Sequence, residues 1–310
     1  MIMRIVVISG LLSAALIAVG CADSGERSRG AGASSGDRVT VVASFYPLAW
    51  LAERTGGKRV DVRNLTPAGA EPHDLELTPR DIAELQSADV VIYMGRGFQP
   101  ALEDALKDSD AQQIDVLETP SLSLITPAAG GKVGEQQHAD EGELDIDPHV
   151  WLDPNRFAAI ADYVAQKLRW EGGEVSGELK SLDGEVRAGL AECERRELFT
   201  SHAAFGYLAD RYDLDQVAIT GLSPEAEPLP RDLERVGDRA RTAGATTIFF
   251  ETLVSPKLSE QIADEVGAQT AVLDPLEGIA QDRLAAGVDY LAVMRENLAA
   301  LQKGLGCATS

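Results

Sequence analysis

The sequence is poor in histidine, cysteine and positive charge. Its 310 residues include four histidines and three cysteines, and 28 Lys and Arg stand against 50 Asp and Glu, which gives a formal net charge of −22. A nucleic-acid-binding protein needs a stripe of Lys and Arg to neutralise phosphates, and this sequence has no such stripe, which argues against nucleic acid as a partner. The apolar fraction of 45% and the charged fraction of 25% are typical of a globular protein.

The sequence also lacks an apolar run of the length that an ordinary membrane-spanning helix needs. Residues 5–20 form an apolar run of 16 residues, whereas a span requires about 20. This run follows a short positively charged start, so residues 1–20 are predicted to be a secretory signal peptide. The sequence AVGC at the junction resembles a bacterial lipobox, in which the cysteine is lipidated. We therefore expect export, a lipid anchor on Cys21 that holds the protein at the outer face of the cytoplasmic membrane, and a flexible Gly/Ser-rich tether over residues 21–37.

The two other cysteines, Cys193 and Cys307, form an even remainder in a chain that we expect to be exported. Exported proteins commonly pair such cysteines, so we predict a disulfide between the middle of the chain and its C-terminal region. The alternative is a pair of unbonded, buried thiols.

Two segments of the sequence resemble each other. Residues 44–67 and 201–224 align without a gap, and each is followed by a Glu-Pro pair, a helix that starts with Arg-Asp, and an apolar run (ADVVIYMG at 88–95, ATTIFFET at 245–252). Each unit predicts the order strand, helix, strand, loop, helix, strand. The apolar, β-branched strands suit a parallel sheet that helices cover on both faces. The sequence therefore predicts an α/β fold of two similar, pseudo-duplicated lobes with parallel central sheets.

Helical segments are predicted between the two units and after the second one. One helix follows Asp153-Pro154, a second runs from about residue 174 to Cys193, and a final helix covers residues 282–305. The predicted domain boundaries follow from these segments. They are an N-terminal lobe over residues 38–173, a single long connecting helix over residues 174–195 and a C-terminal lobe over residues 196–310.

Four polar side chains lie where predicted strands give way to loops. They are His73 in AEPHD, His149 in DPHVWLDP, His202 after ELFTS, and Asp274 after QTAVL. Ligands of parallel α/β sheets collect beyond the carboxyl ends of the strands, so we expect these groups to converge in the cleft between the lobes. Three of the four also have a simple structural explanation: a solvated loop histidine at His73, a helix-start residue at His202, and a turn initiator at Asp274.

Three imidazoles and one carboxylate form a four-coordinate donor set that zinc accepts, and the carboxylate also admits manganese. The sequence contains no H-E-x-x-H pair, so a metalloprotease-type site has no support. Four protein ligands leave no open position for water, which favours metal binding over catalysis. We therefore expect a binding protein and not an enzyme.

The chain from about residue 39 to residue 306 resembles the substrate-binding lipoproteins of bacterial ABC importers for Zn²⁺ and Mn²⁺, the cluster A-I solute-binding family. The resemblance rests on ASFYPLAWLAERTGG, TPAGAEPHDLELTPRDIAELQSADVVIYMG, DPHVWLDP, TSHAAFGYLADRY and ETLVSPKLSEQIADEVGAQTAVLDPLEG. It implies two α/β lobes bridged by a rigid helix, with one metal ion buried between them on His73, His149, His202 and Asp274. It also implies delivery of the ion to an ABC permease, and we expect the protein to be a monomer.

The resemblance also bears on the identity of the ion. In this family a third histidine at the position of His202 goes more often with zinc, and a carboxylate there goes more often with manganese. The expected cargo is therefore Zn²⁺, with Mn²⁺ or iron as the alternative. Zinc-type members often have a long His-rich loop between the first two ligands, whereas residues 131–147 here contain His138 alone among six carboxylates. We interpret this segment as solvated and acidic; the alternative is a reduced ion-collecting loop. A metal-stabilised surface adhesin is the second alternative function.

The two units differ at the histidine positions. AEPLP (residues 226–230) is the counterpart of AEPHD, so Leu229 takes the place of His73, and Phe45 takes the place of His202. We therefore interpret His73 as one lobe's contribution to a shared metal site and not as a solvated loop residue.

Overall fold

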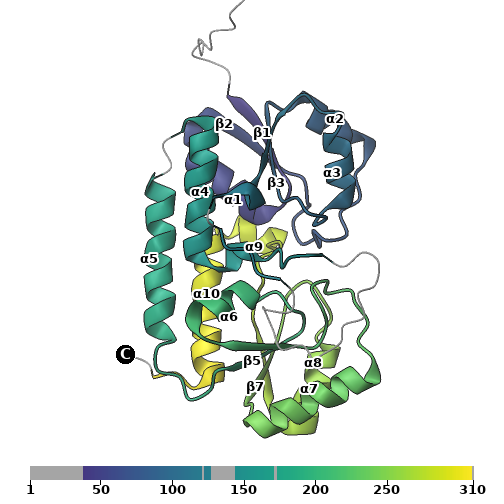
Figure 1. Cartoon of the computed structure of the whole chain (residues 1–310), viewed down its shortest axis with the longest axis vertical. Coiled ribbons are helices and arrows are strands. Elements are labelled where there is room, and N and C mark those ends of the chain that lie inside the picture. Colours follow the sequence, from purple (N-terminus) through teal and green to yellow (C-terminus); the bar gives the residue numbers. More distant parts are fainter. Residues whose placement is uncertain (1–37, 121, 127–143, 171–172, 309–310) are drawn as a thin grey trace, which may run out of the picture. The chain divides into compact units, whose positions relative to one another are not determined.

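Two parallel four-stranded sheets form the framework of the chain (Figure 1). The computed structural model describes residues 38–120, 122–126, 144–170 and 173–308. The predicted signal peptide and tether with Cys21, and also His138, lie outside the described residues. Within the described part of the chain, no helix is both long enough and apolar enough to cross a membrane.

The first sheet has the strand order β2-β1-β3-β4. Its strands are β1 (Val39–Ala43), β2 (Val60–Asn64), β3 (Val90–Tyr93) and β4 (Gln112–Asp115). The connecting elements are α1 (Tyr46–Gly56), α2 (Pro79–Ser87), α3 (Pro100–Leu106) and the short 3-10 turns η1 (Gly57–Arg59) and η2 (Val116–Glu118). Val91 and Ile92 are neighbours on β3 and therefore point to opposite faces, and both are fully buried. The sheet is thus covered on both faces.

The second sheet has the order β6-β5-β7-β8, which repeats the order of the first. Its strands are β5 (Glu197–Thr200), β6 (Asp215–Ala218), β7 (Thr247–Phe250) and β8 (Gln269–Val272). Its helices are α6 (Gly206–Tyr212), α7 (Pro230–Ala243), α8 (Lys257–Val266) and α9 (Gln281–Ala285). The predicted α/β fold of two pseudo-duplicated lobes is confirmed.

The duplication contains an insertion that the ungapped alignment hides. In the first lobe the Thr66 hydroxyl donates to the carbonyl of Ser44, 22 positions away; in the second, the Thr220 hydroxyl donates to the carbonyl of Ser201, 19 positions away. The extra turn η1 lengthens the first unit. Thr66 and Thr220 are therefore the equivalent residues, and the gapless alignment is wrong beyond α1.

The loop that carries His73 is also longer than its counterpart. Thr78 is the N-cap residue of α2, and Leu229 is the N-cap residue of α7. Leu229 therefore corresponds to Thr78 and not to His73, which corrects the pairing of AEPLP with AEPHD. The β2–α2 loop that holds His73 is an enlarged part of the first lobe.

Three long helices lie on one side of the molecule: α4 (Pro154–Leu168) next to the first lobe, α10 (Tyr290–Leu305) next to the second, and α5 (Gly173–Gly189) beside both of these helices (Figure 1). The connecting helix α5 packs against α4 and α10, and its 17 residues give it a length of about 25 Å. It ends at Gly189, four residues before the predicted end at Cys193. The predicted C-terminal helix is two helices, because Asp289 accepts the N–H of Ala292 and starts α10 anew.

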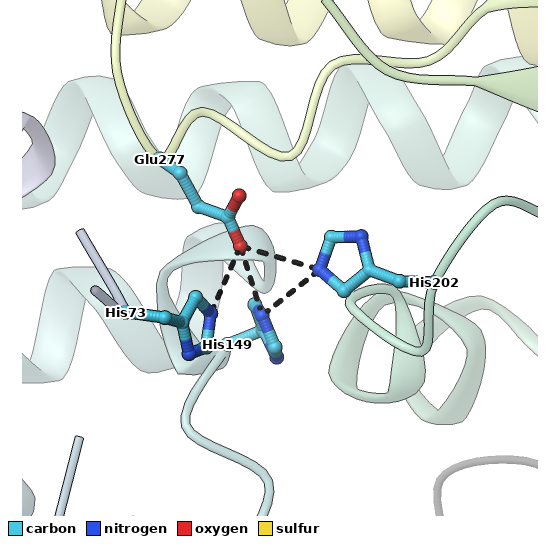
Figure 2. A group of neighbouring side chains, drawn as sticks. All are labelled: His73, His149, His202 and Glu277. Carbon is cyan, nitrogen blue, oxygen red and sulfur yellow. Dashed lines mark hydrogen bonds and ion pairs between the residues drawn. The ribbon is translucent and has the colours of Figure 1, made fainter. Parts of the chain in front are cut away.

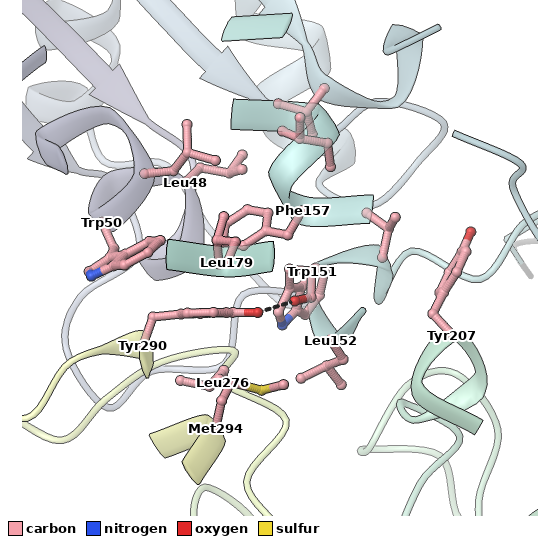
Figure 3. Close-up of a cluster of buried hydrophobic side chains, with 14 of the residues drawn as sticks. Leu48, Trp50, Trp151, Leu152, Phe157, Leu179, Tyr207, Leu276, Tyr290 and Met294 are labelled. Atoms are coloured by element: carbon pink, nitrogen blue, oxygen red, sulfur yellow. Dashed lines mark hydrogen bonds between the residues drawn. The ribbon is translucent and has the colours of Figure 1, made fainter. Parts of the chain in front are cut away.

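Aromatic side chains from the first lobe and the long helices share one core (Figure 3). Trp50 of α1 and Phe157 of α4 both pack on Tyr290 of α10, with ring centroids 4.9 Å apart in each pair. Complete burial of a large apolar side chain contributes about 1.5–3 kcal/mol. Because this core combines elements that flank both sheets, the two lobes are packed against each other.

A disulfide joins Cys193 to Cys307. It links the segment that follows α5 to the segment that follows α10. Beside it, the N–H of Glu194 donates to the carbonyl of Gly306 at 3.2 Å. Helices α5 and α10 are therefore tied together at their C-terminal ends.

Replacement of Cys193 and Cys307 by serine should lower the free energy of unfolding by roughly 2–5 kcal/mol. The bridge closes a loop of 114 positions, and its removal returns conformational entropy to the unfolded chain. Chemical denaturation of the wild type and the double variant measures this loss, and the reduced wild type should show the same loss. A difference below about 0.5 kcal/mol would mean that the bridge contributes little.

Candidate metal centre

Four side chains from loops meet between the two lobes (Figure 2). They are His73 in the β2–α2 loop, His149 just before the turn η3 (Val150–Leu152), His202 after β5, and Glu277 after β8. One donor atom of each residue lies within 4.8 Å of the donor atoms of the others. The structure brings together the three predicted histidines, and it places Glu277 in the group in place of Asp274.

The Oε1 atom of Glu277 faces the Nε2 atoms of all three histidines. It lies 3.3 Å from that of His73, 3.1 Å from that of His149 and 3.3 Å from that of His202. The Nε2 atoms of His149 and His202 are 3.4 Å apart. Around a tetrahedral zinc ion with ligand distances of 2.0–2.1 Å, the donor atoms lie about 3.3 Å from one another. These four separations therefore match the edges of a tetrahedral zinc site.

The donor cluster is almost completely closed to solvent. The side chains of His149, His202 and Glu277 are 0% exposed, and that of His73 is 7% exposed. His73 also lines a cavity of about 300 Å³, together with Phe98 of the first lobe and Leu222 of the second. The side of His73 is therefore the solvent-facing side of the cluster.

Two further buried carboxylates orient the imidazoles of His149 and His202. Asp147 Oδ1 accepts hydrogen bonds from both the backbone N–H and Nδ1 of His149, at 2.9 and 2.8 Å. Glu251 Oε1 accepts from Nδ1 of His202 at 2.7 Å and also from the Ser201 hydroxyl. A proton held on Nδ1 leaves the lone pair on Nε2, which faces the cluster. Each of these histidines is thus set up as a donor through Nε2.

The same carboxylates hold extra protons on the two imidazoles in the metal-free protein. Burial lowers the pKa of His202, but the charges of Glu251 and Glu277 outweigh burial and raise this pKa well above its ordinary value. Burial likewise lowers the pKa of His149, and hydrogen bonds to Asp147 and Glu277 outweigh it and raise the pKa. Protons thus partly offset the buried negative charge.

The residues on the His73 side titrate differently. Burial lowers the pKa of His73, so this imidazole is neutral at pH 7. Burial and the charge of Glu277 raise the pKa of Glu71 to about 9, so Glu71 is protonated at pH 7. Burial also disfavours the ionised form of Glu277, but the charge of His202 and the hydrogen bonds from the histidines hold its pKa well below the usual range. Glu277 is therefore the ionised donor of the cluster.

Asp274 holds the turn that positions Glu277. Its Oδ1 accepts the N–H of Leu276 at 2.8 Å, and its Oδ2 accepts the hydroxyl of Thr252 at 3.2 Å. Leu276 has a φ of 58°, which is unfavourable for a branched residue, and the hydrogen bond from its N–H supports this conformation. The assignment of Asp274 as the fourth donor is corrected accordingly: its carboxylate is engaged in the turn, and Glu277 faces the histidines.

The sequence does contain a signal for Glu277. The segment TAVLDPLEGIA has two acids in an otherwise apolar run, and both Asp274 and Glu277 are buried. A buried acid needs a partner, so each predicts a specific interaction. The sequence pattern does not show which acid faces the cluster, because this depends on the left-handed turn at Leu276.

The fold and the cluster define a class: a two-lobed protein with one closed N3O donor set at the lobe interface, suited to a single divalent transition-metal ion. Residues 41–304 match the family described as zinc-uptake complex component A, periplasmic. The chain belongs to this family.

Known relatives carry related descriptions. The zinc-binding protein AdcA of Streptococcus pyogenes serotype M6 is 32% identical over 286 residues, which cover 86% of this chain and 56% of AdcA. This chain thus spans about half the length of that relative. The high-affinity zinc uptake system protein ZnuA of Bacillus subtilis is 33% identical over 302 residues, 94% of each chain.

A similar solved structure is that of the laminin-binding protein Lmb of Streptococcus agalactiae, described as a bifunctional protein with adhesin and metal transporting activity. It matches with a TM-score of 0.74 and 28% identity, over 86% of this chain and 99% of Lmb.

Two acid-to-amide substitutions distinguish the roles of Glu277 and Asp274. Glu277→Gln should weaken Zn²⁺ binding by more than about 100-fold, because it removes the ionised donor of the cluster. Asp274→Asn should stay within about tenfold of the wild type, because an amide oxygen can still accept the N–H of Leu276. Competition titration against a chromophoric chelator gives both dissociation constants. Weaker binding by Asp274→Asn than by Glu277→Gln would contradict the assignment.

Proposed function

We propose that this chain captures Zn²⁺ outside the cytoplasm and delivers it to the permease of an ABC importer. The observation that carries the proposal is the closed set of four buried donors, three imidazole nitrogens and one carboxylate oxygen, at the spacing of a tetrahedral ion. Membership in the zinc-uptake family and the names of the two zinc-related relatives support the same cargo.

Zinc suits this donor set better than manganese or iron. Mn²⁺ favours oxygen donors and octahedral surroundings, whereas the cluster offers three nitrogens and one oxygen at tetrahedral separations. A carboxylate at the position of His202 would make the site more suitable for manganese, but this chain has an imidazole nitrogen there. Zinc also binds a given site of this kind more tightly than Mn²⁺ or Fe²⁺ does.

The proposed role is binding without catalysis. Four protein donors complete the coordination of a tetrahedral ion, so no position remains at which the ion activates water. Glu71, the other carboxyl group next to His73, has a pKa of about 9 and is therefore protonated at pH 7. A protonated carboxyl group cannot act as a general base.

An extracytoplasmic location is supported by the disulfide between Cys193 and Cys307, because such bonds persist in oxidising compartments. The predicted lipidation of Cys21 would anchor the protein to the outer face of the cytoplasmic membrane. Residues 22–37 would then act as the tether that lets the two lobes reach the permease.

Adhesion is the second candidate function, because the Lmb structure is described as having adhesin as well as metal transporting activity. The metal centre is compatible with both roles, since an ion bound between the lobes also ties them together. In an adhesin, the ion would be a permanent structural part. In a transport component, it is released and replaced.

Substitution of a single histidine tests the site. His149→Ala should weaken Zn²⁺ binding by more than about 100-fold, because a direct donor contributes more than the 10- to 100-fold typical of its supporting residues. His138→Ala is the matched control and should bind like the wild type, because His138 is not one of the four donors that we propose. Isothermal titration calorimetry measures both. Tight binding by His149→Ala would exclude this cluster as the zinc site.

Protons should compete with zinc for the cluster. The pKa values of His149 and His202 lie above their ordinary value of about 6.5, so protons occupy both imidazoles at pH values where a free imidazole is already neutral. As the pH is lowered, the apparent affinity for Zn²⁺ should therefore begin to fall while the pH is still above 6.5. Once both imidazoles are protonated, the fall should reach up to about 100-fold per pH unit. Chelator competition across the range measures this slope.

The protonation of His149 and His202 also determines how the stability of the protein changes with pH. A histidine whose pKa is raised on folding stabilises the protein fully below its unfolded pKa of about 6.5, and this contribution is lost as the pH rises through the folded value. The metal-free protein should therefore lose this contribution above pH 6.5, whereas the ion replaces the protons in the zinc-bound form. Thermal unfolding should show a zinc-induced stabilisation that grows with pH. A stabilisation that is equal at all pH values would contradict the proton–zinc exchange.

A further inference from the structure

Trp151 lies at the junction of the segments that carry two of the four donors. It is located in η3, two residues after His149, and its side chain is completely buried. Its indole Nε1 donates a hydrogen bond to the carbonyl of Pro275 at 2.7 Å. Pro275 precedes Glu277 by two residues. One hydrogen bond therefore joins the His149 segment to the Glu277 segment.

The backbone carbonyl of Trp151 also has a hydrogen-bond partner. The hydroxyl of Tyr290, at the start of α10, donates to the carbonyl of Trp151 at 2.6 Å (Figure 3). Through its indole and its carbonyl, Trp151 thus contacts both the loop after β8 and helix α10. These are two separate elements of the C-terminal part of the chain.

The indole ring also reaches the first lobe. Its ring centroid lies 4.7 Å from that of Phe45 and 6.0 Å from that of Phe98, and Phe98 packs on His73 with centroids 4.8 Å apart. His149 itself lies 5.2 Å from Trp151. The indole therefore belongs to an aromatic group that supports two of the histidines as well as the Glu277 loop.

The backbone of Asp274, at the start of the Glu277 loop, has two other hydrogen bonds, and both come from the C-terminal helix α10. Asn297 of α10 accepts the backbone N–H of Asp274 and donates to its carbonyl, at 2.9 and 2.7 Å. These bonds fix the loop relative to α10, and they do not fix it relative to His149. Besides the contact between the His149 and Glu277 side chains themselves, the Trp151–Pro275 bond relates the two donors' segments through groups that are not donors.

We propose that Trp151 is a positioning residue that sets the separation between the His149 and Glu277 donors and thereby slows release of the bound ion. This inference rests on the proposed zinc-binding function. A tetrahedral ion holds its donors at fixed distances, and a site that is loose by about 1 Å loses much of its affinity. Because the indole spans the two segments before an ion arrives, less ordering remains to be done on binding.

Trp50 offers a matched control for this proposal. It lies in the same aromatic core and packs on Tyr290, but its Nε1 has no hydrogen-bond partner among the described residues. Trp→Phe at either position removes one buried indole. The change at Trp151 also removes the bond to Pro275, whereas the change at Trp50 removes no hydrogen bond that the structure shows.

The experiment measures the rate of Zn²⁺ release into excess chelator by stopped flow for the wild type, Trp151→Phe and Trp50→Phe. Trp151→Phe should release zinc about tenfold faster, and Trp50→Phe should release it at the wild-type rate. The absorption spectrum of the Co²⁺-substituted protein provides a second readout that a purely structural role would not change. The ligand-field bands should shift in Trp151→Phe and remain unchanged in Trp50→Phe.

Equal release rates for Trp151→Phe and the wild type would overturn the proposal, as would equal acceleration by both variants. If Trp151→Phe does not fold, Tyr290→Phe replaces it as the test. This variant loses the hydroxyl that holds the Trp151 carbonyl; it should release zinc severalfold faster, and a wild-type rate would overturn the proposal. Failure of the wild type to bind Zn²⁺ would instead refute the proposed function, so the two failures are distinguishable.

Discussion

The metal centre depends on one buried contact, in which the carboxylate of Glu277 faces three imidazole nitrogens. A carboxylate whose side chain is 0% exposed is costly unless positive charge or hydrogen-bond donors surround it. In the metal-free protein, protons on His149 and His202 supply that charge. A divalent ion at the same point would supply it more effectively. Under the proposed function, the closed cluster is therefore a place where protons and a metal ion would exchange.

This contact requires that four separate loops be held at fixed distances. Each lobe contributes by ending its parallel strands near the same point, and the long helices keep the two lobes packed together. Asp147 and Glu251 then fix the rotation of two imidazoles. The lobes share a strand order but differ in their loops, because the first lobe has the enlarged loop that carries His73. The duplication thus supplies a symmetrical scaffold, and the loops supply an asymmetrical site.

The sequence predicted the features that follow from regular patterns. Apolar β-branched runs indicated the parallel strands, and the loop positions of the histidines indicated that His73, His149 and His202 would come together. The fourth donor was misassigned because Asp274 is a turn residue, and the left-handed conformation of Leu276 brings Glu277 to the histidines. The insertion of η1 and the new helix start at Asp289 were missed for a similar reason. Each depends on local hydrogen bonds and turn geometry that hydrophobic periodicity does not describe.

The central claim is that His73, His149, His202 and Glu277 hold one zinc ion between the lobes. The most direct measurement is anomalous X-ray diffraction at the zinc edge from crystals of the zinc-bound protein. We predict a single strong anomalous peak at about 2.0–2.2 Å from the three Nε2 atoms and from one carboxylate oxygen of Glu277. A peak bound by Asp274 in place of Glu277, or a main peak anywhere else in the protein, would contradict the claim.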